Sequence, residues 1–187
     1  MSVTIYNLVQ LRKSDGSWDA LVGAWTAECV VFEEEFDQYA SASIPVLEQL
    51  AGVDEKDAGV FALVDDSGRY HAVLQANSTH LPGYEGKVLR IRHLLASPAY
   101  DFGEFSLREY SSILSKTFSR VVRLSEVTYP SPHIKMHLRS PSDIAFFEMV
   151  GDFLGNSGLF TSVRIRGAWL YLTKSPDMIS VLEQQGS

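Results

Sequence analysis

Apolar residues recur along the chain with two different spacings, and the spacing predicts which segments are helices and which are strands. From Trp18 to Phe32 they recur every three or four residues, which is typical of an amphipathic helix. Elsewhere they alternate with polar residues or form short runs, which predicts strands. The expected strands cover residues 3–11, 60–64, 70–77, 87–96 and 134–138, with a last strand or hairpin within 160–172; the expected helices cover 18–32, 44–51, 107–122 and 141–150.

Two helix starts carry local signals. Ser106 and Glu109 have the spacing of a capping box, and Ser140 is followed by Pro141 at the first helical position. The order of elements predicts an α/β protein of the α+β type, with a mixed, mostly antiparallel sheet flanked by about four helices. We expect one domain over residues 1–174 and a C-terminal tail over residues 175–187.

This order resembles that of the GNAT superfamily of N-acetyltransferases, from Val3 to about Lys174. Residues 94–103 are similar to the family's fourth strand and the proline-containing run toward its acetyl-CoA pyrophosphate loop. Residues 147–153 are similar to its Tyr-Glu-x-x-Gly-Phe helix, with one residue inserted before the phenylalanine. The resemblance implies an acyl-CoA-dependent N-acetyltransferase that acts on an amine, either a small molecule or a peptide.

Composition and charge narrow the class of protein. The chain has 187 residues, of which 45% are hydrophobic, and its 16 Lys and Arg against 23 Asp and Glu give a net charge of -7. An acidic surface disfavours binding to nucleic acid. The single cysteine, Cys29, excludes an internal disulfide and a cysteine-based zinc site. No membrane-spanning run or signal peptide is visible, so we expect a cytoplasmic protein without a membrane partner.

The resemblance also implies a phosphate cradle for acetyl-CoA. The family pattern, Gln/Arg-x-x-Gly-x-Gly/Ala, aligns with Tyr100, Gly103 and Phe105, so only the first glycine is kept. Phe105 places a large side chain where the backbone must approach phosphate, and acidic side chains flank it. The implied cofactor-binding residues are Leu95, Ala96, Tyr100, Gly103, Glu104, Phe105 and Ser106.

The catalytic positions depart from the family as well. Relatives use a glutamate on the fourth strand as base, whereas this strand offers His93, whose imidazole could take a proton. The alternative is a structural histidine whose hydrogen-bonding groups are satisfied within the sheet. The family's acid, a tyrosine on the fourth helix, corresponds to Phe147, which has no proton to donate. Tyr171, Tyr129 and Tyr110 are candidate substitutes, and no spacing selects one of them.

Four acids, Glu33, Glu34, Glu35 and Asp37, lie between the first two expected helices. In the resembled fold this loop walls the acceptor site, so the cluster is expected to attract a cationic amine substrate. The alternative is a solvated helix end.

Cations alternate along the expected strand 134–138. His133, Lys135, His137 and Arg139 share one side, and Arg90 and Arg92 come from a strand expected to neighbour it. This cationic strip could hold a phosphate, a carboxylate ligand or an acidic partner segment, or it could face solvent. His133 and His137 lack a third ligand, so we expect no metal site.

Two functions therefore remain open. In the first, the chain is an N-acetyltransferase with a degenerate motif, and Phe105→Gly leaves cofactor affinity unchanged or raises it. In the second, the fold is catalytically inactive and serves as a protein-binding or structural subunit; Phe105 then fills the groove, and Phe105→Ala costs roughly 3–5 kcal/mol of stability. A homodimer is compatible with both.

Overall fold

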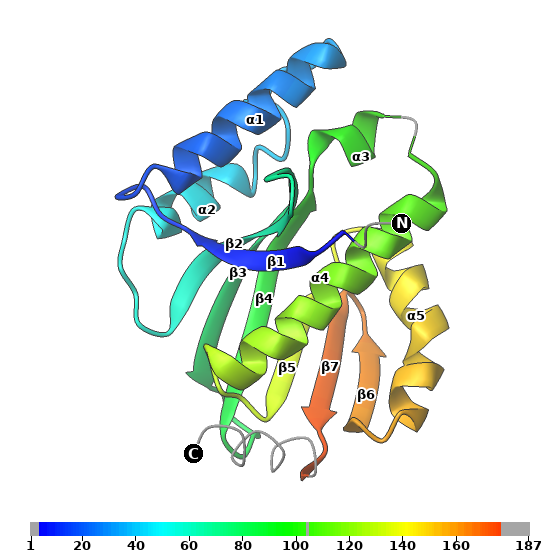
Figure 1. The fold of residues 1–187 in the computed structure, drawn as a ribbon. Coiled ribbons are helices and arrows are strands. Elements are labelled where there is room, and N and C mark those ends of the chain that lie inside the picture. Colours follow the sequence, from blue (N-terminus) through cyan, green and yellow to red (C-terminus); the bar gives the residue numbers. More distant parts are fainter. Residues whose placement is uncertain (1–3, 104, 177–187) are drawn as a thin grey trace. The chain divides into compact units, whose positions relative to one another are not determined.

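The computed structural model describes residues 4–103 and 105–176 and contains a seven-stranded sheet with the order β1-β2-β3-β4-β5-β7-β6 (Figure 1). Of the assigned strand pairs, β1–β2, β5–β7 and β6–β7 are antiparallel and β4–β5 is parallel, which confirms the predicted mixed, mostly antiparallel sheet. The strands are β1 (Tyr6–Leu11), β2 (Ala58–Asp65), β3 (Tyr70–His80), β4 (Lys87–Ala96), β5 (His133–His137), β6 (Phe160–Arg166) and β7 (Trp169–Lys174). The helices are α1 (Ser17–Val31), α2 (Ile44–Ala51), α3 (Pro98–Phe102), α4 (Leu107–Val127) and α5 (Pro141–Asn156).

The chain divides into two compact units. Unit 1 comprises Met1–Ala76 and His93–Arg120, and unit 2 comprises Asn77–Arg92 and Val121–Ser187. The elements β3, β4 and α4 each contribute residues to both units. The domain boundary expected near residue 174 stays a prediction.

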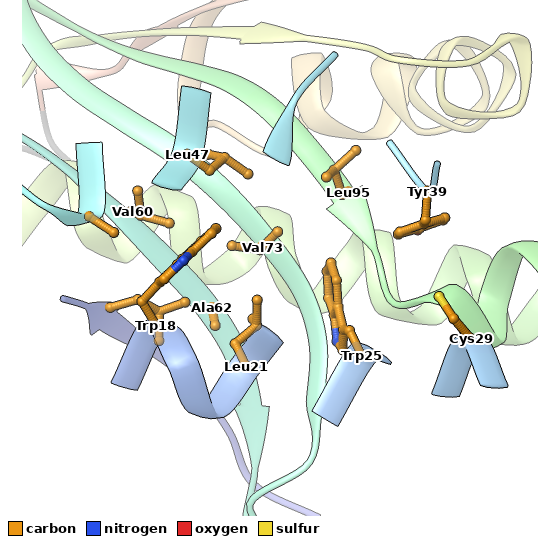
Figure 2. Close-up of a cluster of buried hydrophobic side chains, with 12 residues drawn as sticks. Trp18, Leu21, Trp25, Cys29, Tyr39, Leu47, Val60, Ala62, Val73 and Leu95 are labelled. Carbon is orange, nitrogen blue, oxygen red and sulfur yellow. The ribbon is translucent and has the colours of Figure 1, made fainter. Parts of the chain in front are cut away.

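The core of unit 1 is built on the apolar face of α1. Trp18, Leu21, Trp25 and Cys29 recur every three or four residues, and none exposes more than 1% of its surface (Figure 2). They pack against buried residues of β2, β3 and β4. Burial raises the pKa of the Cys29 thiol, and nearby carboxylates add to the shift, so the thiol is protonated and inert at neutral pH.

The core of unit 2 lies on one face of its strands. Ile134, Met136 and Leu138 are buried, which confirms the alternation expected for β5. The α5 helix begins as predicted: Asp143 N–H donates to Ser140 Oγ, and Ser140 N–H donates to the Asp143 carboxylate. The same carboxylate is 2% exposed, so this cap is part of the core.

Three elements differ from the sequence prediction. Helix α4 continues to Val127, and the short helix α3 begins at Pro98, where only the end of a strand was expected. Helix α5 continues through Gly151 and Gly155, which were expected to end it. A glycine inside a helix costs only about 1 kcal/mol, which the packing of α5 onto β6 outweighs. The expected terminal hairpin is confirmed, with Gly167 at its turn in the left-handed region (φ 55°).

Candidate functional site

A groove of about 620 Å³ in unit 1 is walled by α1, residues 34–37 and the start of α2. Five carboxylates line it: those of Asp19, Glu34, Glu35, Asp37 and Glu48. None of the described lining residues is a lysine, arginine or histidine. The groove therefore carries a concentrated negative potential that attracts cations.

The groove is apolar as well as acidic. Trp18, Val22, Phe36 and Ile44 form part of its wall, and Trp18 belongs at the same time to the buried core. A wall of this kind accommodates carbon chains, while carboxylates at its rim hold charged ends. The combination suits a ligand with ammonium groups on an aliphatic skeleton.

Some of these carboxylates already have local partners. Lys13 Nζ lies 2.7 Å from Glu48 Oε1 at the α2 side, and Gln38 Nε2 donates to Glu35 Oε2 at 2.8 Å. Both contacts are exposed, so they compete with water and contribute little to stability. An incoming ammonium group can replace them at small cost.

The turn after α1 decides which acids enter the groove. Glu33 adopts a left-handed backbone conformation (φ 58°), and Glu34 N–H turns back to donate to Cys29 O at 2.9 Å. Glu34, Glu35 and Asp37 line the groove, whereas Glu33 is not among the lining residues. Sequence reasoning missed Asp19, although its spacing to Val22 follows the helical period of α1.

His93 interrupts β4 with a φ of 49°, a conformation that non-glycine residues rarely adopt in a strand. Its Nδ1 lies 3.0 Å from Ser43 Oγ, and Ser43 directly precedes Ile44, which lines the groove. The backbone strain thus coincides with the position proposed for the base, and the imidazole lies at the start of α2.

Tyr171, the second catalytic candidate, belongs to unit 2. It lies on β7, half-buried, with its ring centroid 5.0 Å from Lys135 Nζ. His93 belongs to unit 1, so the two candidates are described in separate units. Phe147, at the family's acid position, is fully buried in unit 2.

The first residues of the expected cofactor cradle are interior residues. Leu95 is 1% exposed and Ala96 is 8% exposed. The Ala96 carbonyl accepts a hydrogen bond from Tyr39 Oη at 2.6 Å, so this end of β4 is tied to the core of unit 1.

Tyr100 ends a hydrogen-bonded chain that sequence reasoning did not find. Its hydroxyl lies 2.9 Å from His71 Nδ1, and His71 Nε2 lies 2.8 Å from Asp65 Oδ2. Burial raises the pKa of Tyr100 to about 12, so the phenol keeps its proton at neutral pH. No spacing in the sequence connects these three residues, because the pairing of β2 with its neighbours and the position of α3 bring them together.

Gly103 and Phe105, two further residues of the expected cradle, make contacts within the chain. A Cβ atom at Gly103 would clash with the Ala99 carbonyl oxygen, to which Gly103 N–H donates at 2.9 Å, so this glycine permits a close turn after α3. The Phe105 ring stacks on Tyr100 with centroids 4.5 Å apart. Glu104 lies outside the described residues.

The start of α4 carries its own cap. Ser106 N–H donates to Glu109 Oε2 at 2.8 Å, and Glu109 N–H lies 3.3 Å from Ser106 Oγ, which confirms the predicted capping box. A carboxylate therefore occupies the helix end where a pyrophosphate would need free amides and positive potential. The described residues of this segment do not fit the pyrophosphate of acetyl-CoA.

Among the residues that the structure describes, no three His, Cys, Asp or Glu side chains converge as a metal site, and His133 Nε2 instead lies 2.9 Å from the Glu85 carbonyl. Within the same part of the chain, no helix has the length and apolar character needed to cross a membrane.

Comparisons with known proteins give structural likenesses only. No family model matches the chain, and no curated protein matches it. A spermidine/spermine N-acetyltransferase from Vibrio cholerae superimposes with a TM-score of 0.47 at 11% identity, over 97% of this chain and 98% of that one. An acetyltransferase of the GNAT family from Staphylococcus aureus gives 0.42 at 8% identity, over 90% and 99%. The chain spans 14% of a fungal multi-domain beta-N-acetylglucosaminidase with a glucosamine N-acetyltransferase region, with a TM-score of 0.41 at 14% identity over 75% of this chain. The function proposed below therefore rests on the residues of this chain.

Proposed function

We propose that the protein binds a cationic amine in the acidic groove of unit 1, as the acceptor site of an N-acetyltransferase of the GNAT type. The observation that carries the proposal is the composition of the groove: five carboxylates, an apolar wall and no cation among the described lining residues. The order of elements, which resembles that superfamily, supplies the reaction class.

Each part of the groove has a role in this proposal. Glu34, Glu35 and Asp37 attract and orient ammonium groups of the acceptor, and the half-buried Val22 and Phe36 contact its carbon skeleton. A reactive amine must lose a proton before it can act as a nucleophile. His93, held at the start of α2 by Ser43, is our candidate to accept that proton.

A catalytically inactive amine-binding protein is the second candidate, and specific observations favour it. The capped start of α4 does not fit a pyrophosphate, and Phe147 stands where the family's proton donor is expected. In this case the groove binds its amine without chemistry, and the protein acts as a binding or structural subunit.

Calorimetric titration with a linear diamine such as 1,6-diaminohexane tests the binding step. We expect measurable heat with the diamine and none with 1,6-hexanediol, which keeps the skeleton without the charge. The triple variant Glu34→Gln, Glu35→Gln, Asp37→Asn should weaken binding roughly tenfold, since each exposed charge pair contributes about 0.2–1 kcal/mol. Asp66→Asn, an exposed acid in the β2–β3 turn, is the matched control and should leave affinity unchanged. Equal affinity of the triple variant and the control would overturn the proposal.

A second experiment separates the two candidates. The protein is incubated with acetyl-CoA and the diamine, and acetylated product is measured by mass spectrometry. Product that disappears in His93→Gln, while diamine binding persists, supports the enzyme. Diamine binding without product, and without heat from acetyl-CoA, supports the inactive amine-binding protein.

A further inference from the structure

Strand β6 forms one end of the sheet. Its sheet neighbour is β7, and among the described residues no strand pairs with its other edge, which lies beside α5 (Figure 1). An open edge exposes backbone N–H and C=O groups that can pair with an added strand. The seven residues of β6 are long enough to hold such a strand.

One face of the sheet of unit 2 is cationic from β4 to β6. Register places Arg90 opposite Lys135, Lys135 opposite Tyr171, and Tyr171 opposite Arg164. Arg166 lies opposite Trp169, over which the Arg92 guanidinium sits at 5.8 Å. Four strands at roughly 4.8 Å spacing make this face about 14 Å wide. Along it, none of the described positions is an aspartate or glutamate.

Several cations on this face lie over aromatic rings. Lys135 Nζ lies 4.4 Å from the centroid of Trp169 and 5.0 Å from that of Tyr171. The Nε atoms of Arg90 and Arg92 are buried, and neither has a hydrogen-bond partner among the described residues. Because cations already cover the ring faces, the surface suits carboxylates and offers little to stacking nucleobases.

The helices of unit 2 lie on the opposite face. Lys174 Nζ, which alternates with Leu170 and Leu172, reaches Ser125 at the end of α4. Val163 and Ile165, which pair with Leu172 and Leu170, line a groove together with α5. Among the residues that the structure describes, no helix of unit 2 is thus seen to pack on the cationic face of β5, β6 and β7.

The groove between α5 and β6 measures about 400 Å³. Gly151 and Gly155 open it, because a Cβ atom built at either glycine meets nothing within 4 Å. Phe147, Val163 and Ile165 supply apolar surface, whereas Glu148, Asp152 and Arg164 supply charged groups. A strand added beside β6 would therefore have the cationic face on one side and, on the other, a groove in which apolar and charged residues are mixed.

From these observations we propose that β6 accepts an extended acidic segment of a partner protein as an eighth strand. Acidic side chains at alternate positions of the segment face Arg164 and Arg166, and the apolar side chains between them enter the α5–β6 groove. A second copy of β6 is a poor occupant, because antiparallel pairing would set these arginines against their own copies. The proposal is independent of the acidic groove of unit 1.

The test uses a fluorescein-labelled peptide of alternating glutamate and valine, titrated with the full chain and followed by anisotropy. A peptide of the same composition with its glutamates and valines in two blocks keeps the charge but loses the alternation. We expect the alternating peptide to bind at least fivefold more tightly, and Arg164→Gln with Arg166→Gln to weaken it at least tenfold. The control Arg123→Gln, on α4, should leave affinity unchanged.

Hydrogen exchange distinguishes strand addition from binding by charge alone, because only backbone pairing should protect the amides of β6. Binding of the alternating peptide should slow exchange of the backbone amides of residues 160–166, and Gly151→Leu, which fills the groove, should weaken binding without lowering the melting temperature. Equal binding of both peptides, or unchanged exchange in β6, would overturn strand addition. Competition by tripolyphosphate in the absence of peptide selectivity would assign the face to small anions instead and overturn the proposal.

Discussion

The acidic groove of unit 1 and the cationic face of unit 2 show two ways in which one chain can concentrate charge. The groove draws its carboxylates from positions as far apart as Asp19 and Glu48, on two helices and the loop between them. The cationic face draws its charges from alternate positions of neighbouring strands, as Arg164 and Arg166 illustrate. The chain as a whole carries a net charge of -7, so the cationic face runs against the average.

Both surfaces depend on an apolar layer directly behind them. Trp18 lines the acidic groove and is buried in the core of unit 1, and Met136 is buried between Lys135 and His137 on the other face of β5. Charged side chains can be held close together only if this layer fixes the backbone that carries them.

The largest effect is expected from Trp25→Ala, which removes the centre of the layer behind the acidic groove. Trp25 is fully buried, and its Nε1–H donates to the Tyr70 carbonyl at 3.3 Å. We expect the free energy of unfolding to fall by about 3–5 kcal/mol, because the ring leaves a cavity. Urea denaturation measures this loss. Val31→Ala, on the exposed end of the same helix, should change stability by less than about 0.5 kcal/mol. A loss below 1 kcal/mol for Trp25→Ala would show that the groove does not depend on this layer.

Asp65→Asn tests the polar chain behind Tyr100. Burial alone would raise the pKa of the Asp65 carboxyl, but hydrogen bonds from Ser67, His71 and the backbone outweigh it and hold the pKa well below 3.8. A depressed folded pKa stabilises the protein above the unfolded value, and this contribution is lost as pH falls below about 4. We expect the variant to lose about 1–3 kcal/mol at pH 7 and to match wild type more closely at pH 3. Denaturation at both pH values measures this, with Asp66→Asn as control. A constant difference between the pH values would contradict the assignment.

The sequence predicted those parts of the fold that depend on local patterns, and it failed where tertiary packing decides. Helix α1 and strand β5 were found because their apolar positions recur with one clear period, and Ser106 and Ser140 marked helix starts with short-range hydrogen bonds. The predicted end of α5 at residue 150 was wrong, because tertiary packing stabilises the helix beyond Gly151. The short helix α3 was missed, since five residues contain too little periodicity.

The candidate site was predictable where its residues adjoin in sequence. Glu34, Glu35 and Asp37 were found together, whereas Glu48 required knowing that α2 lies beside α1. The chain from Asp65 through His71 to Tyr100 depends on three separate elements, so no local pattern could indicate it. The cationic strip was visible as alternation along β5, but its continuation to Arg164 required the β5–β7–β6 register.

Lys174→Met tests the buried cation of unit 2, whose contribution to stability rises with pH like that of Asp65 but at alkaline rather than acidic pH. Burial lowers the pKa of the Lys174 ammonium, and Glu126 only partly opposes the shift. The folded state therefore releases this proton more readily than the unfolded state, and the contribution of Lys174 to stability rises as pH climbs toward about 10.5. At pH 7 we expect the variant to lie within about 1 kcal/mol of wild type, since an apolar replacement removes the desolvation cost. In urea denaturation the stability of wild type should rise relative to that of the variant as the pH is raised from 7 toward 10.5. A parallel course of the two curves would show that the ammonium is not desolvated.

The smallest effect separates stability from binding. Gly23 in α1 and Gly151 in α5 both lie inside helices, and a Cβ atom at either meets nothing within 4 Å. Gly23→Ala and Gly151→Ala should each raise the free energy of unfolding by about 0.5–1 kcal/mol, because alanine loses less backbone entropy on folding. Of these two glycines, Gly151 alone lines the α5–β6 groove. Gly151→Ala should therefore weaken binding of the alternating peptide by a few-fold, and Gly23→Ala should leave it unchanged. Thermal melts and anisotropy on the same two variants measure both quantities. If the two variants bind the peptide equally well, the groove contributes nothing to recognition, and the cationic face alone must account for binding.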